Sequence, residues 1–529
     1  MRRGTALQWL SLVGVIWLQS FNGTNSNFPA YSSQLKQLLS LSQLQLNNLA
    51  LASDAGKLFG WFAGIAAIYL PLWLVLLIGS TLGLIGYGLQ YLFLTHYITF
   101  LSYWHIFFLT VLAGNGICWI NTVCYLVAIH NFPYHRQAAV GLTTSYLGLS
   151  AVIYTAAVGA FSTKPSKRAE VYMLFNALIP LIVSVITAPF VRYIDTGKPK
   201  KVEHGFFVVL MITIATGIYA VASSLGPLSS MSSPWFKVVG VTICLTAPLL
   251  IPMGEFCFGL LEEKCCINRE RRVCDVTTDA DEVELEDVEN WLKDQDNDVE
   301  NWVKDQDSDV VEGKEEIRAI ENIGAKLMMK RLNFWLYFFI YITGATLGLV
   351  YLNNLGQIAE SRGYLKTSSL VSLASAMTFF GRLLPSILDY AYSSMVPGPA
   401  SILVSMVPMA ASFFLLMING SNLSLHVSTA IIGFSTGIIT AISVSTTTEL
   451  FGPKHFGVNH NIVVANIPLG SFLFGGLAAI LYHKNGDGHG KCLGLQCYST
   501  TFVVWGSLCS LGAFLALVLH FRTRKFYLH

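Results

Sequence analysis

Long apolar segments, each followed by a short polar stretch, recur along most of the chain. Segments of about 20 apolar residues are long enough to cross the roughly 30 Å hydrocarbon core of a bilayer. Continuous apolarity favours helices, because a membrane β-barrel would show short alternating strands. Fourteen membrane helices are predicted, at residues 6–31, 48–71, 73–94, 104–131, 137–161, 169–192, 205–226, 235–260, 332–355, 367–391, 399–418, 426–449, 458–482 and 499–521. The chain is therefore predicted to be an all-α polytopic membrane protein.

The first of these segments changes character half-way. The apolar run ALQWLSLVGVIWL is followed by SFNGTNSNFPAYS, which is rich in amides and hydroxyls. Arg2 and Arg3 before a short apolar run are also found in signal peptides, but the polar stretch that follows lacks a clean small-x-small cleavage site. We predict a transport helix whose polar outer half faces a cavity, with a bend at Pro29.

Charge is sparse and concentrated in one insert. The chain has 529 residues and is 53% hydrophobic and 12% charged, whereas soluble proteins carry about 25% charged residues. Of its 31 acidic residues, 22 lie between Leu261 and Arg331. The net charge of +2 argues against a nucleic-acid partner.

This distribution predicts three regions. Residues 1–260 form a six-helix bundle plus two extra helices, residues 261–331 an acidic and largely disordered cytosolic linker, and residues 332–529 a second six-helix bundle. An even number of spans places both termini on one side of the membrane. With both termini and the linker in the cytosol, 18 Lys and Arg fall inside and eight outside, so this orientation is predicted for a plasma membrane or an endomembrane.

The acidic insert contains a tandem repeat, DVENWLKDQDN from Asp287 and DVENWVKDQDS from Asp298. A partial calcium loop nearby has Val310 where such a loop needs glycine, so no metal site is predicted. The composition is typical of a solvated linker. The alternative is that residues 275–312 recruit a protein partner.

Motifs of nucleotide-driven pumps and enzymes are missing from the sequence. There is no GxxxxGK[ST] or HExxH motif and no paired CxxC. No enzyme activity and no cofactor are therefore predicted. A proton or solute gradient would have to drive any transport.

A weak internal repeat relates the two bundles. Aligning Trp9 with Trp335 brings Asn27 onto Asn353. Parallel six-helix halves that bind substrate between them are one known transporter design. Six amides are predicted to line a substrate cavity: Asn25, Asn27, Asn353, Asn354, Asn115 and Asn466. The alternative is that these amides only bridge neighbouring helices.

Charged residues at membrane depth are costly and are usually functional. Asp54 and Lys57 are three residues apart and share a helix face, so we predict an ion pair that acts in gating or proton coupling. The alternative is a structural pair near the outer end of the helix. Arg382, Asp389 and Glu449 are predicted to control a cytosolic gate.

The last outer loop holds two cysteines, Cys492 and Cys497. Because this loop is predicted to face an oxidising compartment, the pair is a candidate disulfide. Neither cysteine suggests a metal site.

Several stretches resemble one plant family. They are residues 53–94 and 132–155 in the first half, and FFGRLLPSILDY, ELFGPKHFGVNHNIVVANIPLGSF and KCLGLQCYSTTF in the second. Together they are similar to the plant Nodulin-like, or nuclear-fusion-defective-like, branch of the major facilitator superfamily. The resemblance implies two helical bundles and alternating access. It also implies that Arg382 and Asp389 form a Gly-Arg…Asp pattern at a cytosolic helix end.

The chain departs from this pattern at one place. The resemblance leads us to expect a Lys-Gly pair early in the fifth span, where the chain has Thr144 and Ser145. If that lysine serves substrate or coupling in the family, this member differs. The predicted function is secondary active transport of a small molecule or ion across a lipid bilayer. The alternative is a non-transporting membrane sensor or scaffold that acts through the acidic insert.

Overall fold

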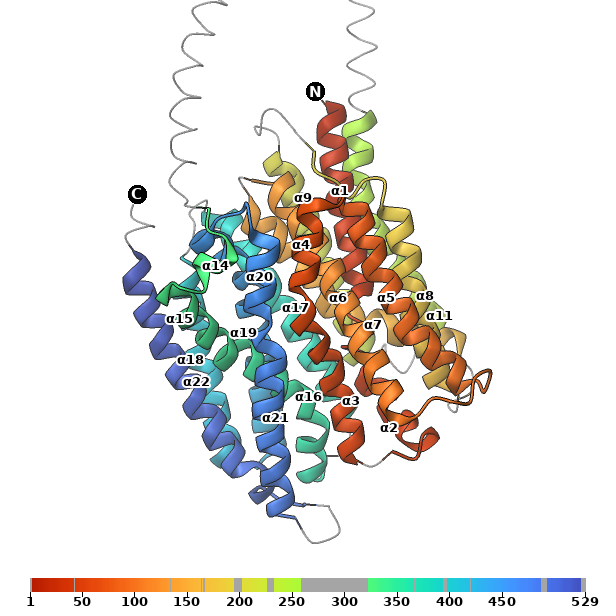
Figure 1. The fold of residues 1–529 in the computed structure, drawn as a ribbon, viewed down its shortest axis with the longest axis vertical. Helices are drawn as coiled ribbons and strands as arrows, with labels where there is room; N and C mark the ends of the chain where they lie inside the picture. The colour runs from red at the N-terminus through yellow and green to blue at the C-terminus, as the bar shows by residue number, and fades with distance from the viewer. Residues whose placement is uncertain are drawn as a thin grey trace, which may run out of the picture.

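The computed structural model describes residues 2–524, apart from 42, 134, 163, 165–166, 195–201, 226–232, 258–321, 365–366, 393–396, 419 and 487–491. Within these residues every regular element is a helix (Figure 1). Nearly all of the predicted acidic linker lies outside the described residues, including its repeat and residues 275–312. The all-helical fold class is confirmed.

The first half contains the helices α1 (Arg2–Asn22), α2 (Phe28–Leu38), α3 (Gln43–Ala55), η1 (Gly56–Phe59), α4 (Trp61–Tyr69), α5 (Leu72–Leu94), α6 (Tyr103–Asn131), α7 (Arg136–Phe161), α8 (Arg168–Thr187), α9 (Val202–Leu225), α11 (Pro234–Thr246) and η3 (Ala247–Leu249). The second half contains α14 (Ala325–Met328), α15 (Leu332–Tyr341), η4 (Ile342–Thr346), α16 (Leu347–Ser361), α17 (Thr367–Tyr392), α18 (Gly398–Ile418), α19 (Asn422–Phe451), α20 (Phe456–Val464), α21 (Asn466–Lys484) and α22 (Gln496–Thr523).

Twelve helical segments of the described chain are long and apolar enough to cross a membrane. They coincide with the third to fourteenth predicted spans. The first and second predicted spans fall on α1 and on the interrupted run α3–η1–α4, which are not among the twelve. The count of fourteen therefore stays a prediction. The first turn of α1 and the last turn of α22 lie at the same end of the molecule, as an even number of spans requires (Figure 1).

The polar half of the first segment does not continue helix α1. The helix ends at Asn22, residues 24–27 form turns, and α2 begins at Phe28 with Pro29 in its first two positions. Gly23 lies against α7, where a Cβ would come within 2.6 Å of the Ser150 Cβ. Proline is favoured at a helix start, where its missing N–H leaves no acceptor unpaired. The predicted continuous helix through residue 31, bent at Pro29, is wrong.

Two pairs of helices form the main contacts between the halves, and each contact is called a seam. In the α4–α20 seam, α20 packs on α4 and on η1, and α21 packs on α3. In the α7–α17 seam, α7 packs along α17. One buried apolar cluster includes residues of both halves, such as Tyr146 of α7 and Phe379 of α17. The halves therefore share part of their core.

Helices α9 and α11 lie on one side of this arrangement. Helix α9 packs on α7 and on α17, and α11 packs on α7 and α9. The Phe379 ring occupies the space over Gly217 of α9, where a Cβ would come within 2.1 Å of it. Tyr146 of α7 is hydrogen-bonded to Thr213 of α9 at 3.1 Å. The two extra helices thus lie beside the α7–α17 seam, and they do not lie beside the α4–α20 seam.

Three helical runs are interrupted, and two of them, α3–η1–α4 and α20–α21, belong to the α4–α20 seam. A 3₁₀ turn, η1, separates α3 from α4, and a π-helical turn, η4, separates α15 from α16. Ala465 separates α20 from α21. Such departures from α-helical geometry are often found at hinges and functional sites. By contrast, α7 and α17 each form one unbroken helix.

Candidate functional site

The interrupted run α3–η1–α4 positions the first charged group. Lys57 Nζ lies 2.6 Å from Asp54 Oδ1, and the two side chains are 12% and 7% exposed. Gly56 holds the chain against α6, where a Cβ would come within 2.3 Å of the Val111 carbonyl oxygen. The structure thus contains the ion pair that the spacing predicts. The gating or coupling role of this pair stays a prediction.

This ion pair also contacts the other half. Ser471 of α21 donates a hydrogen bond to Asp54 Oδ2 at 3.1 Å. Lys57 lies twelve residues before the inner end of α4 at Tyr69, or about 18 Å along a helix at 1.5 Å per residue. The pair therefore lies near the middle of the run α3–η1–α4 and in contact with the other half, and its gating role and the structural alternative both stay predictions.

The same seam brings two backbones into contact nearer the inner end. A Cβ on Gly64 of α4 would lie 2.4 Å from the carbonyl carbon and oxygen of Gly457 in α20. One turn away, Asn461 donates a hydrogen bond to Thr122 of α6 at 2.8 Å. Small residues allow this approach, as in other membrane helix pairs.

Arg382 of α17 lies in the α7–α17 seam and is 7% exposed. It donates one hydrogen bond to the Thr144 carbonyl of α7 at 3.2 Å, while its buried Nε has no partner. Among the described residues, no carboxylate lies within 4.0 Å of the guanidinium. The hydroxyls of Tyr125 and Tyr341 are within electrostatic range of it.

The depth of Arg382 differs from the expectation. It lies ten residues before Tyr392, the last residue of α17, or about 15 Å from that end. The resemblance places both residues at one helix end. Asp389 lies three residues from the end of α17, whereas Arg382 lies near the middle of the helix. Gate control stays a prediction for Arg382.

Asp389 connects the halves at the inner end of the same seam. Its Oδ2 accepts a hydrogen bond from the Ala138 backbone N–H at 3.2 Å, in the first turn of α7. Ser386 donates to the Ala138 carbonyl at 2.8 Å. A carboxylate at a helix N-terminus satisfies free N–H groups and the helix dipole. This cap depends on the halves being in contact, which agrees with the predicted gate role without testing it.

Glu449 lies in the last turn of α19. Its Oε2 is 3.2 Å from the position of a Cβ built on Gly398, at the N-terminus of α18. Both helices belong to the second half. The carboxylate thus lies beside a helix start within one bundle, and its gate role stays a prediction.

The amides of the first half are engaged with their own bundle. Asn27 is 1% exposed, and its Nδ2 donates to Asn176 Oδ1 of α8 at 2.8 Å. Asn176 returns a hydrogen bond to Asn27 Oδ1 at 3.3 Å. Asn25 is half-buried beside a small cavity within this half, lined also by Ser53, Gln90 and Thr110. For Asn27 the helix-bridging alternative is what the structure shows.

The remaining amides differ in exposure. Asn353 is exposed, and Asn354 is half-buried and donates to the Val350 carbonyl of its own helix at 2.8 Å. Asn115 is half-buried, and its Oδ1 has no partner. Asn466 is fully buried, accepts a hydrogen bond from Thr346 at 2.6 Å and has an unpaired Nδ2. The proposed cavity role of this set is untested.

His460 of α20 was not predicted. It is 4% exposed and lies 3.0 Å from Thr447 through Nδ1. Its ring stacks on Phe456 and meets the edge of Tyr125 from the other half. A single histidine on an apolar helix carries no sequence signal that separates a functional group from a core residue.

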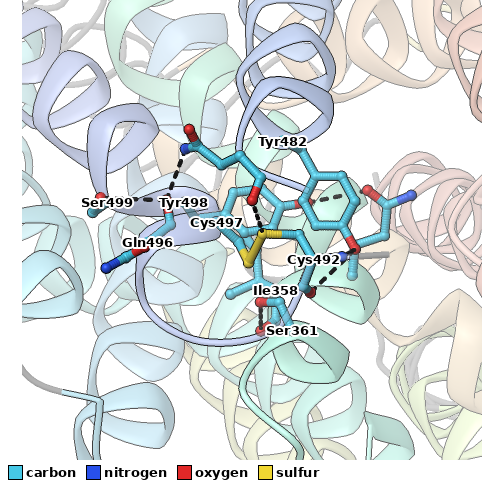
Figure 2. The surroundings of a disulfide bond; sticks show 10 residues. Ile358, Ser361, Tyr482, Cys492, Gln496, Cys497, Tyr498 and Ser499 are labelled. Carbon is cyan, nitrogen blue, oxygen red and sulfur yellow. Dashed lines mark hydrogen bonds between the residues drawn. A yellow bond between two sulfur atoms is a disulfide. The ribbon is translucent and has the colours of Figure 1, made fainter. Parts of the chain in front are cut away.

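The outer loop after α21 is closed by the disulfide between Cys492 and Cys497, with Cα atoms 5.7 Å apart (Figure 2). The Cys492 N–H donates to the Tyr482 hydroxyl at 3.2 Å. Gly494, in the loop between the cysteines, has a φ of +101° and donates to the Ser361 carbonyl at 2.7 Å. This loop is thereby attached to the outer end of α16. No group of three metal-ligating side chains occurs in the described part of the chain.

Comparison with solved structures identifies the architecture. The chain aligns with a proton:xylose symporter of the major facilitator superfamily, XylE, with a TM-score of 0.56 and 11% identity, covering 96% of this chain and 95% of that one. It also aligns with the transporter FucP in its outward conformation, with a TM-score of 0.50 and 12% identity, covering 98% and 99%. The fold is that of the major facilitator superfamily, and the chain is an integral, multi-pass membrane protein.

Sequence comparison identifies the family. Residues 8–253 match the Nodulin-like family model, and residues 316–529 match the model of the NFD4 C-terminal domain. The chain is 37% identical over 541 residues to Protein NUCLEAR FUSION DEFECTIVE 4 of Arabidopsis thaliana, covering 98% of this chain and 89% of that protein. The predicted resemblance is confirmed, and the chain belongs to the Nodulin-like, NFD4-type branch of the major facilitator fold.

Proposed function

We propose that the protein is a secondary active transporter of a small solute, working by alternating access and driven by a proton or solute gradient. The observation that carries this proposal is the interface itself. Charged side chains lie buried near mid-span in the contacts between the two helical halves, and two helical runs of the α4–α20 seam, α3–η1–α4 and α20–α21, are interrupted there. Buried polar groups at membrane depth usually mark a solute or ion path. The proton:xylose symporter that shares the fold supports the same interpretation.

In this mechanism the halves rock about the site, and the two seams open and close in turn. The Asp389 cap on α7 and the Gly64–Gly457 contact hold the inner part of the interface together. Opening the inner side must break both. The interrupted helices let the α4–α20 seam change shape without breaking a regular hydrogen-bond ladder.

Coupling would act through Asp54, Lys57 and Ser471. In the present state the carboxylate is shared by a lysine in its own half and a hydroxyl in the other. Protonation of Asp54 would release both partners, so that proton binding and the inter-half contact are linked. No enzyme activity is proposed. The gate residues and the amides Asn25, Asn115, Asn353, Asn354 and Asn466 remain part of this proposal, whereas Asn27 is paired with Asn176.

The test is uptake into vesicles that contain the purified full-length protein, followed by untargeted analysis of metabolites and metals. We expect at least one small solute to accumulate under an imposed gradient. Uptake should fall about tenfold or more in Gly64→Val, because a clash of 1–3 kcal/mol in the closed seam changes the conformational equilibrium by that order. Gly83→Ala is the matched control, since nothing lies within 4 Å of its Cβ position. Uptake equal to that of protein-free vesicles would contradict the proposal.

The alternative, recruitment of a partner through residues 275–312, makes the opposite prediction. Deleting these residues should leave uptake by the transporter unchanged, because the seams and the buried charges that carry this proposal lie outside residues 275–312. A scaffold that acts through the insert would instead lose its function on deletion, while Gly64→Val would have little effect on it. Running both variants in one assay separates the two functions.

A further inference from the structure

The most unusual side chain of the interface is Arg382. It is 7% exposed and lies about 15 Å from the inner end of its helix, near mid-span. Its single hydrogen bond is to a backbone carbonyl, and its Nε is buried without a partner. Burying a charge without a counter-charge is strongly unfavourable, so buried arginines are normally paired with a carboxylate.

The nearby carboxylates are already engaged. Asp54 is paired with Lys57 and accepts from Ser471. Asp389 lies seven residues further along α17, roughly 10 Å along the axis, and caps α7. The Asp54–Lys57 pair is neutral overall. Among the lysine, arginine and carboxylate groups described at this depth, Arg382 therefore leaves one positive charge unbalanced.

Two cations lie at similar depths in opposite halves. Lys57 of the first half lies about 18 Å from the end of α4, and Arg382 of the second half lies about 15 Å from the end of α17. Asn466 adds a buried amide Nδ2 without a partner on the second half.

We propose that the transported solute carries a small anionic group, a carboxylate or a phosphate, that binds the Arg382 guanidinium at the interface. This inference rests on the proposed transport function and names its substrate class. A guanidinium presents paired N–H donors that fit the oxygens of a carboxylate or phosphate. In this structure the Arg382 guanidinium donates its hydrogen bond to the Thr144 carbonyl of α7, at the place where the anion would bind. Binding of the anion replaces that contact when the seam opens.

The first test needs no ligand. Full-length Arg382→Met, Arg382→Lys and wild-type protein are compared in nanodiscs by thermal unfolding. Removing an unbalanced buried charge should raise the midpoint by about 2 °C or more in Arg382→Met, and Arg382→Lys should not gain this stability. A lowered midpoint in Arg382→Met would show that the arginine is a structural residue and would overturn the inference.

The second test uses matched acid and amide pairs, acetate with acetamide and succinate with succinamide, beside inorganic phosphate and sulfate. An acid should raise the unfolding midpoint of the wild type, its amide should not, and the apparent affinity should fall about tenfold or more in Arg382→Met. Comparing the shifts caused by the carboxylic acids with those caused by phosphate and sulfate identifies the class of anion that binds. Arg522→Met is the control, because Arg522 is exposed and contacts Asn333 at the end of α22.

Three results of the second test would overturn the inference. These are equal shifts by acid and amide, a shift that persists in Arg382→Met, and no shift of the wild type by any of the anions. Uptake measurements on the same samples separate this inference from the proposed function. If a neutral solute is transported and no anion shifts the unfolding midpoint, the transport function is supported and the anion site is contradicted. If an anion binds and no solute is transported, the anion site is supported and the transport function is contradicted.

Discussion

The α4–α20 and α7–α17 seams join the same two halves by different chemistry. In the α4–α20 seam, side chains bond side chains, as in Asn461 with Thr122 and Ser471 with Asp54. In the α7–α17 seam, the side chains of α17 bond the backbone of α7, at Ala138 and Thr144. The first seam has interrupted helices, whereas the second has continuous helices covered by α9.

This difference indicates that the two seams have different roles in a conformational change. Bonds to backbone groups fix the register of two continuous helices, so the α7–α17 seam is suited to act as a hinge. Bonds between short side chains beside interrupted helices are more easily exchanged, so the α4–α20 seam is suited to change shape. Four substitutions test this comparison, beginning with the largest expected effect.

Asp54→Ala should destabilise the protein most. It leaves Lys57 buried without a counter-charge, and breaking a buried ion pair typically costs about 3–5 kcal/mol in the free energy of unfolding. Removing both partners in Asp54→Ala/Lys57→Met should restore most of that loss. Denaturant unfolding in nanodiscs measures Asp54→Ala, Lys57→Met and the double variant, and strictly additive losses in the double variant would show that the pair contributes no coupling.

Gly64→Ala should cost less, about 1–3 kcal/mol, because its Cβ would meet Gly457 at 2.4 Å. Gly83→Ala is expected to raise the free energy of unfolding instead, since alanine stabilises a helix by about 0.5–1 kcal/mol where space is open. The unfolding midpoints of the two variants provide the comparison. If Gly64→Ala is also stabilising, the backbones of α4 and α20 are not in contact.

Asp389→Ala should lose about 0.5–2 kcal/mol through the missing cap on α7. Hydrogen exchange of the first turn of α7, including the Ala138 amide, should accelerate, while the rest of the helix changes little. Asp389→Asn keeps a hydrogen-bond acceptor and should lie between the wild type and alanine. Unchanged exchange at Ala138 would contradict the cap.

Asn461→Ala should have the smallest effect, about 0.6 kcal/mol, the average for a hydrogen bond between membrane helices. A double-mutant cycle with Thr122→Ala measures the coupling energy directly. A coupling above that of the Asp54–Lys57 pair would reverse the order of the comparison and make Asn461 the main link of the α4–α20 seam.

The sequence predicts long spans better than their interruptions. A run of apolar residues gives the length and type of a helix, so the third to fourteenth spans are located correctly. The 3₁₀ turn at Gly56–Phe59 and the π turn at Ile342–Thr346 leave the apolar pattern intact, and hydropathy therefore contains no trace of them. The end of α1 at Asn22 depends on a contact between Gly23 and Ser150 that lies 127 positions away in the chain.

The sequence likewise could not predict which side chains contact each other when they are far apart along the chain. The Asp54–Lys57 pair and the Cys492–Cys497 disulfide involve neighbours in sequence, and both are present. Asn27 is paired with Asn176 instead of facing Asn353, because helix packing selects among many chemically equal amides. Arg382 was recognised as a residue of interest, but its missing carboxylate is visible only when every neighbour is placed.

The packing of α9 on α17 sets an order for biosynthesis. Gly217 of α9 leaves the ribosome 162 residues before Phe379, which fills the space above it. At about 5–20 residues per second, this interval is roughly 10–30 s. During that time the surface of α9 around Gly217 lacks the Phe379 ring that covers it in the folded protein. The packing of α9 is therefore completed only after the second half has been made.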